Sequence, residues 1–201
     1  DFLDTIAAEL EQRKADIVSS MVLETALTAA RAETELGRTC NQLRLFASEL
    51  RQPAIDCNLP ALPERQPLPR PALRLTKMPL GPVVVFAASN FPLAFSVAGG
   101  DTASALAAGC PVIVKAHNAH PATSELAAQA IAAAADKTAM PAGVFNLVHA
   151  RQHAFSEALI RHPAVKGVAF TGSEQLGMHF QRLIWQRPEP IPFFAEMGSQ
   201  N

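Results

Sequence analysis

Four apolar runs after residue 81 lead directly into polar or glycine residues of types that bind ligands or move charge. Asn90 follows PVVVFAAS, Lys115 ends PVIVK, and Glu196 lies near the end of IPFFAEMG. A fourth run enters FTGSEQLG, in which Ser173 begins a helical pattern after Gly172. A helix N-terminus supplies unpaired N–H groups for a phosphate, and carboxylates are common proton acceptors in enzymes. These positions are therefore the candidate site.

Each of these residues also has a plainer interpretation that its type alone leaves open. An Asn before Phe-Pro is a common turn former, and a Ser such as Ser173 is a common helix N-cap. Lys115 and Glu196 are charged residues of the kind that usually face solvent. The two glycines of FTGSEQLG are weak evidence alone, and the GxGxxG dinucleotide fingerprint is absent. The functional interpretation depends on the motifs taken together.

The elements that would position these residues follow from the spacing of apolar residues. The runs PVVVF, PVIVK, GVFNLV, KGVAFTG and IPFFAEM alternate with helical segments expected at residues 93–109, 121–137, 154–161 and 173–185. This alternation predicts βαβ units and a parallel sheet. Because VVVF and VIV are apolar at consecutive positions, helices should cover both faces of the sheet. The fold class is therefore α/β, a doubly wound, Rossmann-like parallel sheet, in which ligands bind beyond the carboxyl ends of the strands.

Two segments precede this sheet. Residues 1–52 contain helical spacing of apolar residues and predict an antiparallel pair of helices. Residues 53–82 contain eight prolines, which remove backbone donors and disfavour helix, so we expect an extended connector. The predicted organisation is a helical segment at 1–52, a connector at 53–82 and a dinucleotide-binding domain at 83–201.

Composition excludes several classes of function. With a net charge of −1 and 17% charged residues, the chain has no basic patch for nucleic acid, and polar residues interrupt each apolar stretch that could cross a membrane. No secretory signal pattern is present at the start, so we expect a cytoplasmic protein. Cys40, Cys57 and Cys110 form no CxxC pair and have no His at zinc-ligand spacing. Neither a disulfide framework nor a metal site is predicted.

The N-F-P sequence at Asn90, the strand-ending Lys115, FTGSxxxG and the E-x-G of Glu196 together resemble the aldehyde dehydrogenase superfamily, in its order and approximate spacing across residues 79–201. The resemblance implies NAD(P)-dependent oxidation of a small-molecule aldehyde to a carboxylic acid by a homo-oligomer. The stretch at residues 89–126 is most similar to the branch of α-ketoglutarate semialdehyde and long-chain fatty aldehyde dehydrogenases. A semialdehyde such as 2,5-dioxopentanoate is therefore a candidate substrate.

The resemblance also implies roles for single residues. Asn90 matches the amide that donates to the oxyanion formed when a nucleophile adds to the aldehyde, and Glu196 matches the general base. Lys115 matches the lysine that binds the adenine-side ribose, and Ser173 with the amides around Gly172 matches the pyrophosphate contact. The implied cofactor-binding residues are Ala87, Ala88, Ser89, Lys115, His117, Asn118, Arg151, Gly172 and Ser173.

Asn118 bears on the choice between NAD and NADP. Many NAD-preferring relatives carry a Glu at this position, whose carboxylate would repel a 2′-phosphate. A neutral amide removes that repulsion, and His117 and Arg151 are candidates to add attraction. Arg151 can equally be a solvated loop residue. NAD and NADP are both allowed, and NADP is favoured.

The family's nucleophile is a cysteine a few tens of residues beyond E-x-G, whereas these residues end at Asn201. None of the three cysteines matches its motif, and Cys110 lies at the entry to a strand, opposite the candidate site. We expect the 201 residues to be part of a longer protein and inactive alone, because no thiolate can attack the aldehyde. Their last strand should leave an unpaired sheet edge.

Two other functions remain open. A non-catalytic module that binds a nucleotide or a partner would share the fold without the chemistry. A reductase acting on acyl phosphates or acyl-CoA would share both fold and nucleophile, although Glu196 in E-x-G context favours the hydrolytic dehydrogenases.

Overall fold

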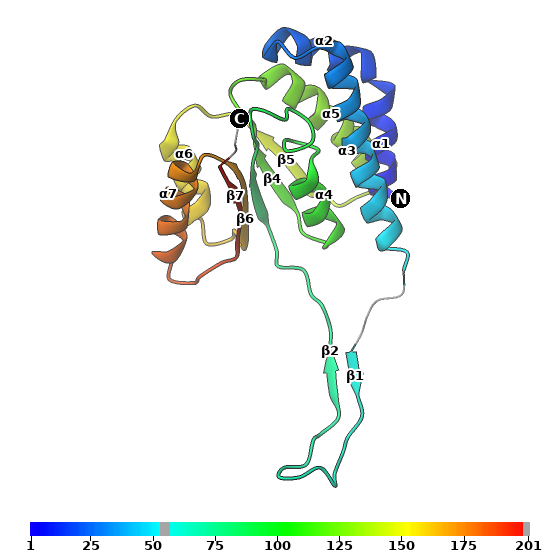
Figure 1. Cartoon of the computed structure of the whole chain (residues 1–201), viewed down its shortest axis with the longest axis vertical. Coiled ribbons are helices and arrows are strands. Elements are labelled where there is room, and N and C mark those ends of the chain that lie inside the picture. The colour runs from blue at the N-terminus through cyan, green and yellow to red at the C-terminus, as the bar shows by residue number, and fades with distance from the viewer. Residues whose placement is uncertain (53–56, 199–201) are drawn as a thin grey trace.

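A five-stranded parallel sheet forms the centre of the computed structural model, which describes residues 1–52 and 57–198. Its strand order is β5-β4-β3-β6-β7, and every neighbouring pair is parallel (Figure 1). The parallel sheet expected from the five apolar runs is confirmed. The strands are β3 (Val83–Phe86), β4 (Val112–Lys115), β5 (Phe145–Val148), β6 (Gly167–Gly172) and β7 (Phe193–Met197).

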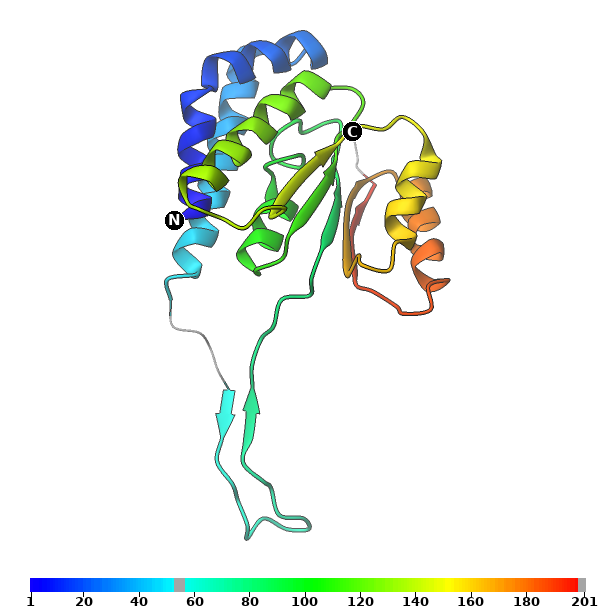
Figure 2. The ribbon, with the colours of Figure 1, turned by 180° about the vertical axis from the view of Figure 1, so that it is seen from behind.

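Helices cover both faces of this sheet, as the continuous apolar runs predict. The helices are α4 (Gly100–Ala107) and α5 (Pro121–Lys137) on one face, and α6 (His153–Arg161) and α7 (Glu174–Trp185) on the other (Figures 1 and 2). In β3, Val83 and Val85 join the apolar cluster that contains α4 and α5, whereas Val84 and Phe86 join the cluster with α6 and α7. Alternate side chains of one strand therefore serve two cores.

The helix expected at residues 93–109 is shorter than predicted, because α4 begins only at Gly100. The residues before it form turns, and the N–H groups of Leu93 and Ala94 donate to the side chain of Glu35 instead of to helical carbonyls. The chain enters the helix through Gly99, and Gly100 N–H donates to Ala94 O at 3.1 Å. A partner distant in sequence therefore decides where this helix starts.

Residues 1–52 form three helices and not two: α1 (Phe2–Gln12), α2 (Lys14–Thr25) and α3 (Ala29–Glu49). The first predicted helix breaks at Arg13, whose ψ of 12° lies outside the helical range. The break allows both halves to pack on α5, and Ile6, Leu10 and Ile17 are fully buried. The chain then reverses at Ala26, in the left-handed conformation, and α3 returns alongside α1 and α2.

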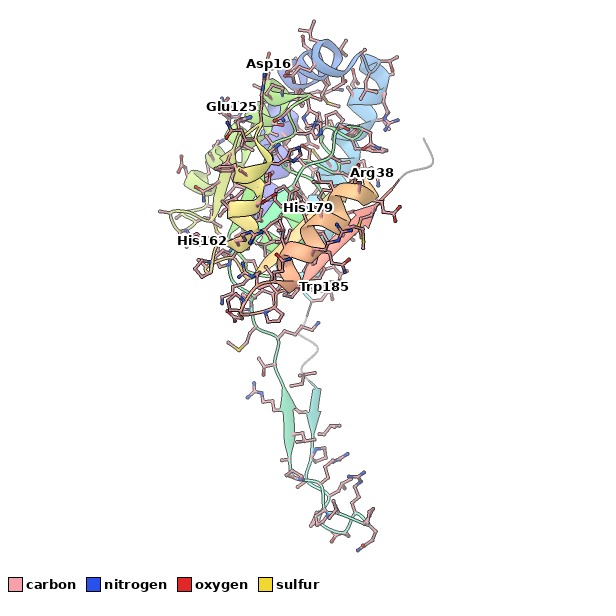
Figure 3. All side chains as sticks on the ribbon, turned by 90° about the vertical axis from the view of Figure 1, so that its left-hand side faces the viewer. Asp16, Arg38, Glu125, His162, His179 and Trp185 are labelled. Carbon is pink, nitrogen blue, oxygen red and sulfur yellow. The ribbon has the colours of Figure 1, made fainter. Side chains whose placement is uncertain are left out.

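A two-stranded arm projects from this body (Figures 1 and 3). It pairs β1 (Cys57–Leu59) with β2 (Leu73–Leu75) in antiparallel register, and Leu62 bridges to Arg70 further out. The expected connector is thus extended but also paired, which its prolines did not indicate; residues 53–56 of it lie outside the described part. Across the described residues, no helix is long and apolar enough to cross a membrane.

The two adjacent glycines at the start of α4 provide a test of how tightly the preceding turn is packed. A Cβ on Gly99 would overlap the carbonyl oxygen of Ala94, whereas a Cβ on Gly100 would meet no atom within 4 Å. We expect Gly99→Ala to destabilise the fold by about 1–3 kcal/mol, because backbone cannot move aside as a side chain can. Gly100→Ala should leave stability unchanged or slightly higher. Urea unfolding of both variants measures the difference, and equal midpoints would contradict the close contact.

Candidate functional site

The strand order places a crevice at the carboxyl ends of β3 and β6. From β3 the chain moves outward through β4 to β5, then crosses back to β6 on the other side of β3. The loops after β3 and β6 therefore leave in opposite directions, which creates a site for ligands at this point of a parallel sheet. Two adjoining clefts of about 590 and 380 Å³ lie here, and both are lined by Ala88, Ser89, Thr171, Gly172 and Ser173.

The larger cleft, here called the Asn90 cleft, brings together the two residues expected to do chemistry. Asn90 from the loop after β3 and Glu196 from β7 both line it, and both side chains are exposed. Phe91 and Phe95 form one of its walls, with ring centroids 5.1 Å apart in an edge-to-face arrangement. An amide donor and a carboxylate thus share one cleft with an aromatic wall.

The smaller cleft, here called the Lys115 cleft, collects all the residues expected to bind the cofactor. It lies at the carboxyl ends of β3, β4 and β6, and extends to the loop before α6. The expected residues that line it are Ala87, Ala88, Ser89, Lys115, His117, Asn118, Arg151, Gly172 and Ser173. They come from four separate segments of the chain, so the fold alone assembles this group.

The N-terminus of α7 opens onto both clefts. Ser173 is its N-cap, with extended backbone (φ −68°, ψ 145°), and its hydroxyl accepts from the N–H of Leu176 at 3.4 Å. The capping interpretation is therefore correct, and it is compatible with phosphate binding because other first-turn N–H groups lack helical partners. At Gly172 a Cβ would lie 2.6 Å from the ring of Phe170, so a side chain there would crowd the entry to the helix.

Burial lowers the pKa of two basic side chains at one end of the Lys115 cleft, Lys115 and His117. Lys115 Nζ donates to Asn118 Oδ1 at 3.4 Å, and burial lowers the pKa of Lys115. Burial, with the neighbouring His120 and Lys115, lowers the pKa of His117 to about 4. His117 Nδ1 accepts from the N–H of Ala119 at 3.1 Å, so its proton is on Nε2. At neutral pH His117 is therefore uncharged, and any attraction that it adds for a phosphate comes from a hydrogen bond donated by Nε2.

His120 and Glu35 are two residues that the sequence did not single out, and both hold the loop after β3. His120 is fully buried, and its Nε2 lies 2.8 Å from the carbonyl oxygen of Ala88, to which it must donate. Ser124 Oγ lies 3.1 Å from Nδ1 on its other side. Neither residue belongs to a local motif, and Glu35 is separated from its partner Leu93 by 58 positions. No short-range signal would have found them.

His117 gives the fold a predicted pH dependence. Its pKa is 6.5 in a reference state and about 4 in the fold, so between these values the unfolded chain binds more protons. This contribution to stability is complete above about pH 6.5 and is lost as pH falls toward 4. We expect His117→Gln to lose less stability between pH 7 and pH 5 than the unmodified chain. Urea unfolding at both pH values tests this, with His162→Gln as control; equal losses would contradict the burial of His117.

The whole chain matches one family model, described as Aldehyde dehydrogenase family, over residues 1–201. It is 56% identical over 205 residues to alpha-ketoglutaric semialdehyde dehydrogenase 2 of Azospirillum brasilense. It is 49% identical over 206 residues to alpha-ketoglutaric semialdehyde dehydrogenase of Acinetobacter baylyi. All of the chain is covered in both comparisons, and it spans 38% of the length of each relative.

Solved structures agree on the fold. The NADP complex of an NADP-dependent glyceraldehyde-3-phosphate dehydrogenase from Bacillus halodurans covers the whole chain with a TM-score of 0.87 at 24% identity, and the chain covers 40% of it. An NAD-dependent benzaldehyde dehydrogenase from Corynebacterium glutamicum covers 98% of the chain with a TM-score of 0.80, also at 24% identity, and 40% of that structure is matched. Because the family model spans all 201 residues, the chain belongs to the aldehyde dehydrogenase family.

Proposed function

We propose that this chain supplies the cofactor site, the oxyanion donor and the general base of an enzyme that oxidises an aldehyde to a carboxylic acid. The observation that carries the proposal is the junction of the two clefts at Ser89, Gly172 and Ser173. A ligand in the Lys115 cleft can therefore reach a substrate held beside Asn90. The two α-ketoglutaric semialdehyde dehydrogenases among the relatives support a semialdehyde such as 2,5-dioxopentanoate as substrate.

The residues of the Lys115 cleft fit a nicotinamide dinucleotide. The N-terminus of α7 offers N–H groups and the positive end of a helix dipole to the pyrophosphate, with Ser173 beside it. Lys115 stands at the end of β4, where its ammonium can donate to ribose hydroxyls. A bound nicotinamide would supply the acceptor for the hydride that the substrate carbon gives up. The residues that line both clefts, among them Ser89, Gly172 and Ser173, would hold the cofactor next to the Asn90 cleft.

Asn90 and Glu196 take the chemical roles in this proposal. The Asn90 amide donates to the carbonyl oxygen as that oxygen gains negative charge. Removal of one such donor typically raises the activation free energy by about 2.7–4 kcal/mol. Glu196 takes a proton from the attacking thiol or, later, from the hydrolytic water. The thiol itself belongs to the part of the enzyme that follows these residues, since the resemblance implies a cysteine beyond E-x-G.

We propose NADP as the preferred cofactor on the basis of charge in the Lys115 cleft. Asn118 is neutral and already accepts a hydrogen bond from Lys115, so no carboxylate faces a 2′-phosphate there. Arg151 lines the same cleft and is exposed, and neutral His117 can donate one hydrogen bond. Attraction thus comes from Lys115 and Arg151, and repulsion is absent from these positions.

A homo-oligomer is the proposed assembly of the whole enzyme. The arm formed by β1 and β2 exposes a row of apolar side chains, and large exposed apolar patches are typical of interaction surfaces. Burial of these side chains against a second copy would remove them from water. They are Leu59, Leu62, Leu68, Leu73 and Leu75.

The proposed activity is tested with a joined protein, in which this chain is followed by the C-terminal remainder of the Azospirillum brasilense relative. We expect it to form NADPH from NADP+ with a semialdehyde, while the 201 residues alone bind the nucleotide without turnover. Asn90→Ala should lower kcat about 10²- to 10³-fold. Asn146→Ala, exposed on β5, is the matched control and should leave kcat unchanged.

If the joined protein neither binds nucleotide nor turns over, the catalytic proposal is wrong and a non-catalytic module is the better account. Sedimentation of the same sample tests the assembly, and a monomer at micromolar concentration would contradict the homo-oligomer.

The cofactor proposal predicts the effect of one added charge. We expect Asn118→Glu to weaken NADP+ binding while leaving NAD+ binding unchanged or tighter. Two like charges about 4 Å apart repel by about 1 kcal/mol even at the dielectric constant of water, which corresponds to roughly fivefold weaker binding or more. Calorimetric titration of the 201-residue chain with both nucleotides measures this. Asn41→Glu, exposed on α3, adds the same charge elsewhere and should change neither affinity; equal weakening for both nucleotides would place the 2′-phosphate away from Asn118.

A further inference from the structure

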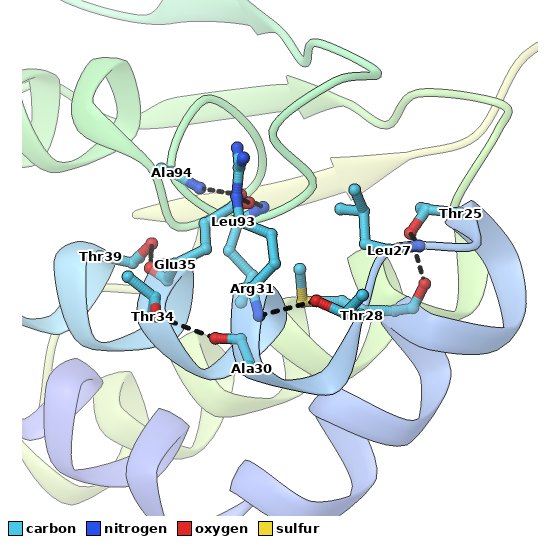
Figure 4. A network of polar contacts seen from close by, with 11 residues as sticks. Thr25, Leu27, Thr28, Ala30, Arg31, Thr34, Glu35, Thr39, Leu93 and Ala94 are labelled. Carbon is cyan, nitrogen blue, oxygen red and sulfur yellow. Dashed lines mark hydrogen bonds and ion pairs between the residues drawn. The ribbon is translucent and has the colours of Figure 1, made fainter.

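A glutamate of the N-terminal helices reaches into the loop that carries Asn90. Glu35 lies on α3, and one of its carboxylate oxygens, Oε1, accepts from the N–H groups of Leu93 at 2.8 Å and Ala94 at 3.0 Å (Figure 4). These two residues follow Asn90 by three and four positions. The contact therefore joins α3, a helix of the N-terminal segment, to the turn that carries the Asn90 side chain.

The burial of this carboxylate indicates that the contact is specific. The Glu35 side chain is 1% exposed, and a buried charge is costly unless it is hydrogen-bonded and paired. Its second oxygen, Oε2, is buried and has no hydrogen-bond partner among the described residues; Arg31 Nε lies 3.8 Å from it. Two charge-assisted bonds to Oε1 are thus the main compensation for bringing Glu35 into the interior.

The same face of α3 holds the aromatic wall of the Asn90 cleft. Residues 31, 35 and 38 are spaced so that they lie on one side of a helix. The guanidinium carbon of Arg31 lies 4.6 Å from the ring centroid of Phe91, and that of Arg38 lies 5.0 Å from the centroid of Phe95. Phe91 directly follows Asn90, so α3 contacts the loop on both sides of the turn.

The loop is closed by backbone bonds at its base. Ala88 N–H donates to Phe95 O at 2.8 Å, and Phe95 N–H donates to Phe91 O at 3.3 Å. The exposed side chain of Asn90 projects from this closed loop into the cleft. Within the loop, Leu93 and Ala94 direct their N–H groups to Glu35, so loss of that carboxylate leaves two buried donors without a partner.

We propose that Glu35 is a positioning residue for catalysis, which fixes the loop of residues 88–95 against α3 so that the Asn90 amide points at the reacting carbonyl. The proposal rests on the proposed function, in which Asn90 is the oxyanion donor. Glu35 touches neither substrate nor cofactor and acts only through the loop.

Variants of the joined protein separate this role from a merely structural one. Glu35→Ala removes the acceptor and should lower kcat at least about tenfold with a smaller change in the KM for nucleotide, because Lys115, Asn118 and Arg151 of the Lys115 cleft lie outside the loop that Glu35 holds. Glu35→Gln keeps an oxygen acceptor and should restore most of the kcat. The double variant Glu35→Ala with Asn90→Ala should be no slower than Asn90→Ala alone. Both substitutions remove the same interaction, the hydrogen bond from the Asn90 amide to the reacting carbonyl.

Glu9→Ala is the matched control. Glu9 is also a buried glutamate of the N-terminal helices, but its partners are Arg13 and Lys137. It should lose stability and keep kcat. The positioning role is overturned if the kcat of Glu35→Ala lies within about twofold of that of Glu9→Ala. It is also overturned if the fold-loss of kcat in the double variant equals the product of the fold-losses of Glu35→Ala and Asn90→Ala.

A second readout does not depend on turnover and uses the 201-residue chain. Glu35→Ala, which removes the acceptor, should speed hydrogen exchange at the amides of Leu93 and Ala94 and shift the NMR signals of the Asn90 side-chain amide. Glu35→Gln should change them less, and Glu9→Ala should do neither. Unchanged exchange and unchanged Asn90 signals would overturn the proposal. If the exchange rates and the Asn90 signals change while the unmodified joined protein shows no activity, the proposed function is wrong. The conclusion that Glu35 fixes the loop is then still supported.

Discussion

The backbone of the loop after β3 must satisfy its polar groups away from the sheet, and much of the site depends on how it does so. At Ala88 the chain leaves the hydrogen-bonded ladder with β4, and the carbonyl of Ala88 accepts a hydrogen bond from His120 instead of from a strand. The N–H groups of Leu93 and Ala94 then donate to the carboxylate of Glu35. Buried N–H and C=O groups without partners are rare because each costs free energy, so these two side chains determine the path of the loop.

From this constraint the arrangement of the two clefts follows. The strand order opens a crevice between the ends of β3 and β6, and the held loop divides it into one part beside Phe91 and another beside Lys115. Ser173, at the start of α7, borders both parts. The groups proposed to react and the groups proposed to bind the cofactor thus border on one shared residue, while each cleft keeps its own other lining residues.

The sequence predicted best those elements whose causes are local. The span of α5 was expected at 121–137 and is found there, because a proline at N1 and a polar end bound an alanine-rich run. The start of α7 was also correct, since Ser173 is its own signal. Elements fixed by distant partners were missed: the break at Arg13 serves packing on α5, and the late start of α4 reflects Glu35, which no pattern near residue 93 reveals.

The candidate site divides in the same way. Asn90, Lys115 and Glu196 were singled out because they lie at or near the ends of apolar runs, and a parallel sheet brings the ends of its strands together. The charge state of His117 could not be predicted from the sequence, because its low pKa results from burial and from two neighbours that only the fold supplies.

The N-terminal helices are best understood as part of the site. Residues from α1, α2 and α3 share one apolar cluster with α4, α5 and one face of the sheet, so they bury the surface that those helices would otherwise expose. If packing were their whole contribution, an apolar residue on α3 would serve at position 35 without the cost of burying a charge. A carboxylate there accepts two backbone N–H bonds that no apolar side chain can accept, and those bonds lie in the turn that presents Asn90. The charge at position 35 is therefore explained by the loop it holds and not by the stability of the helix that carries it.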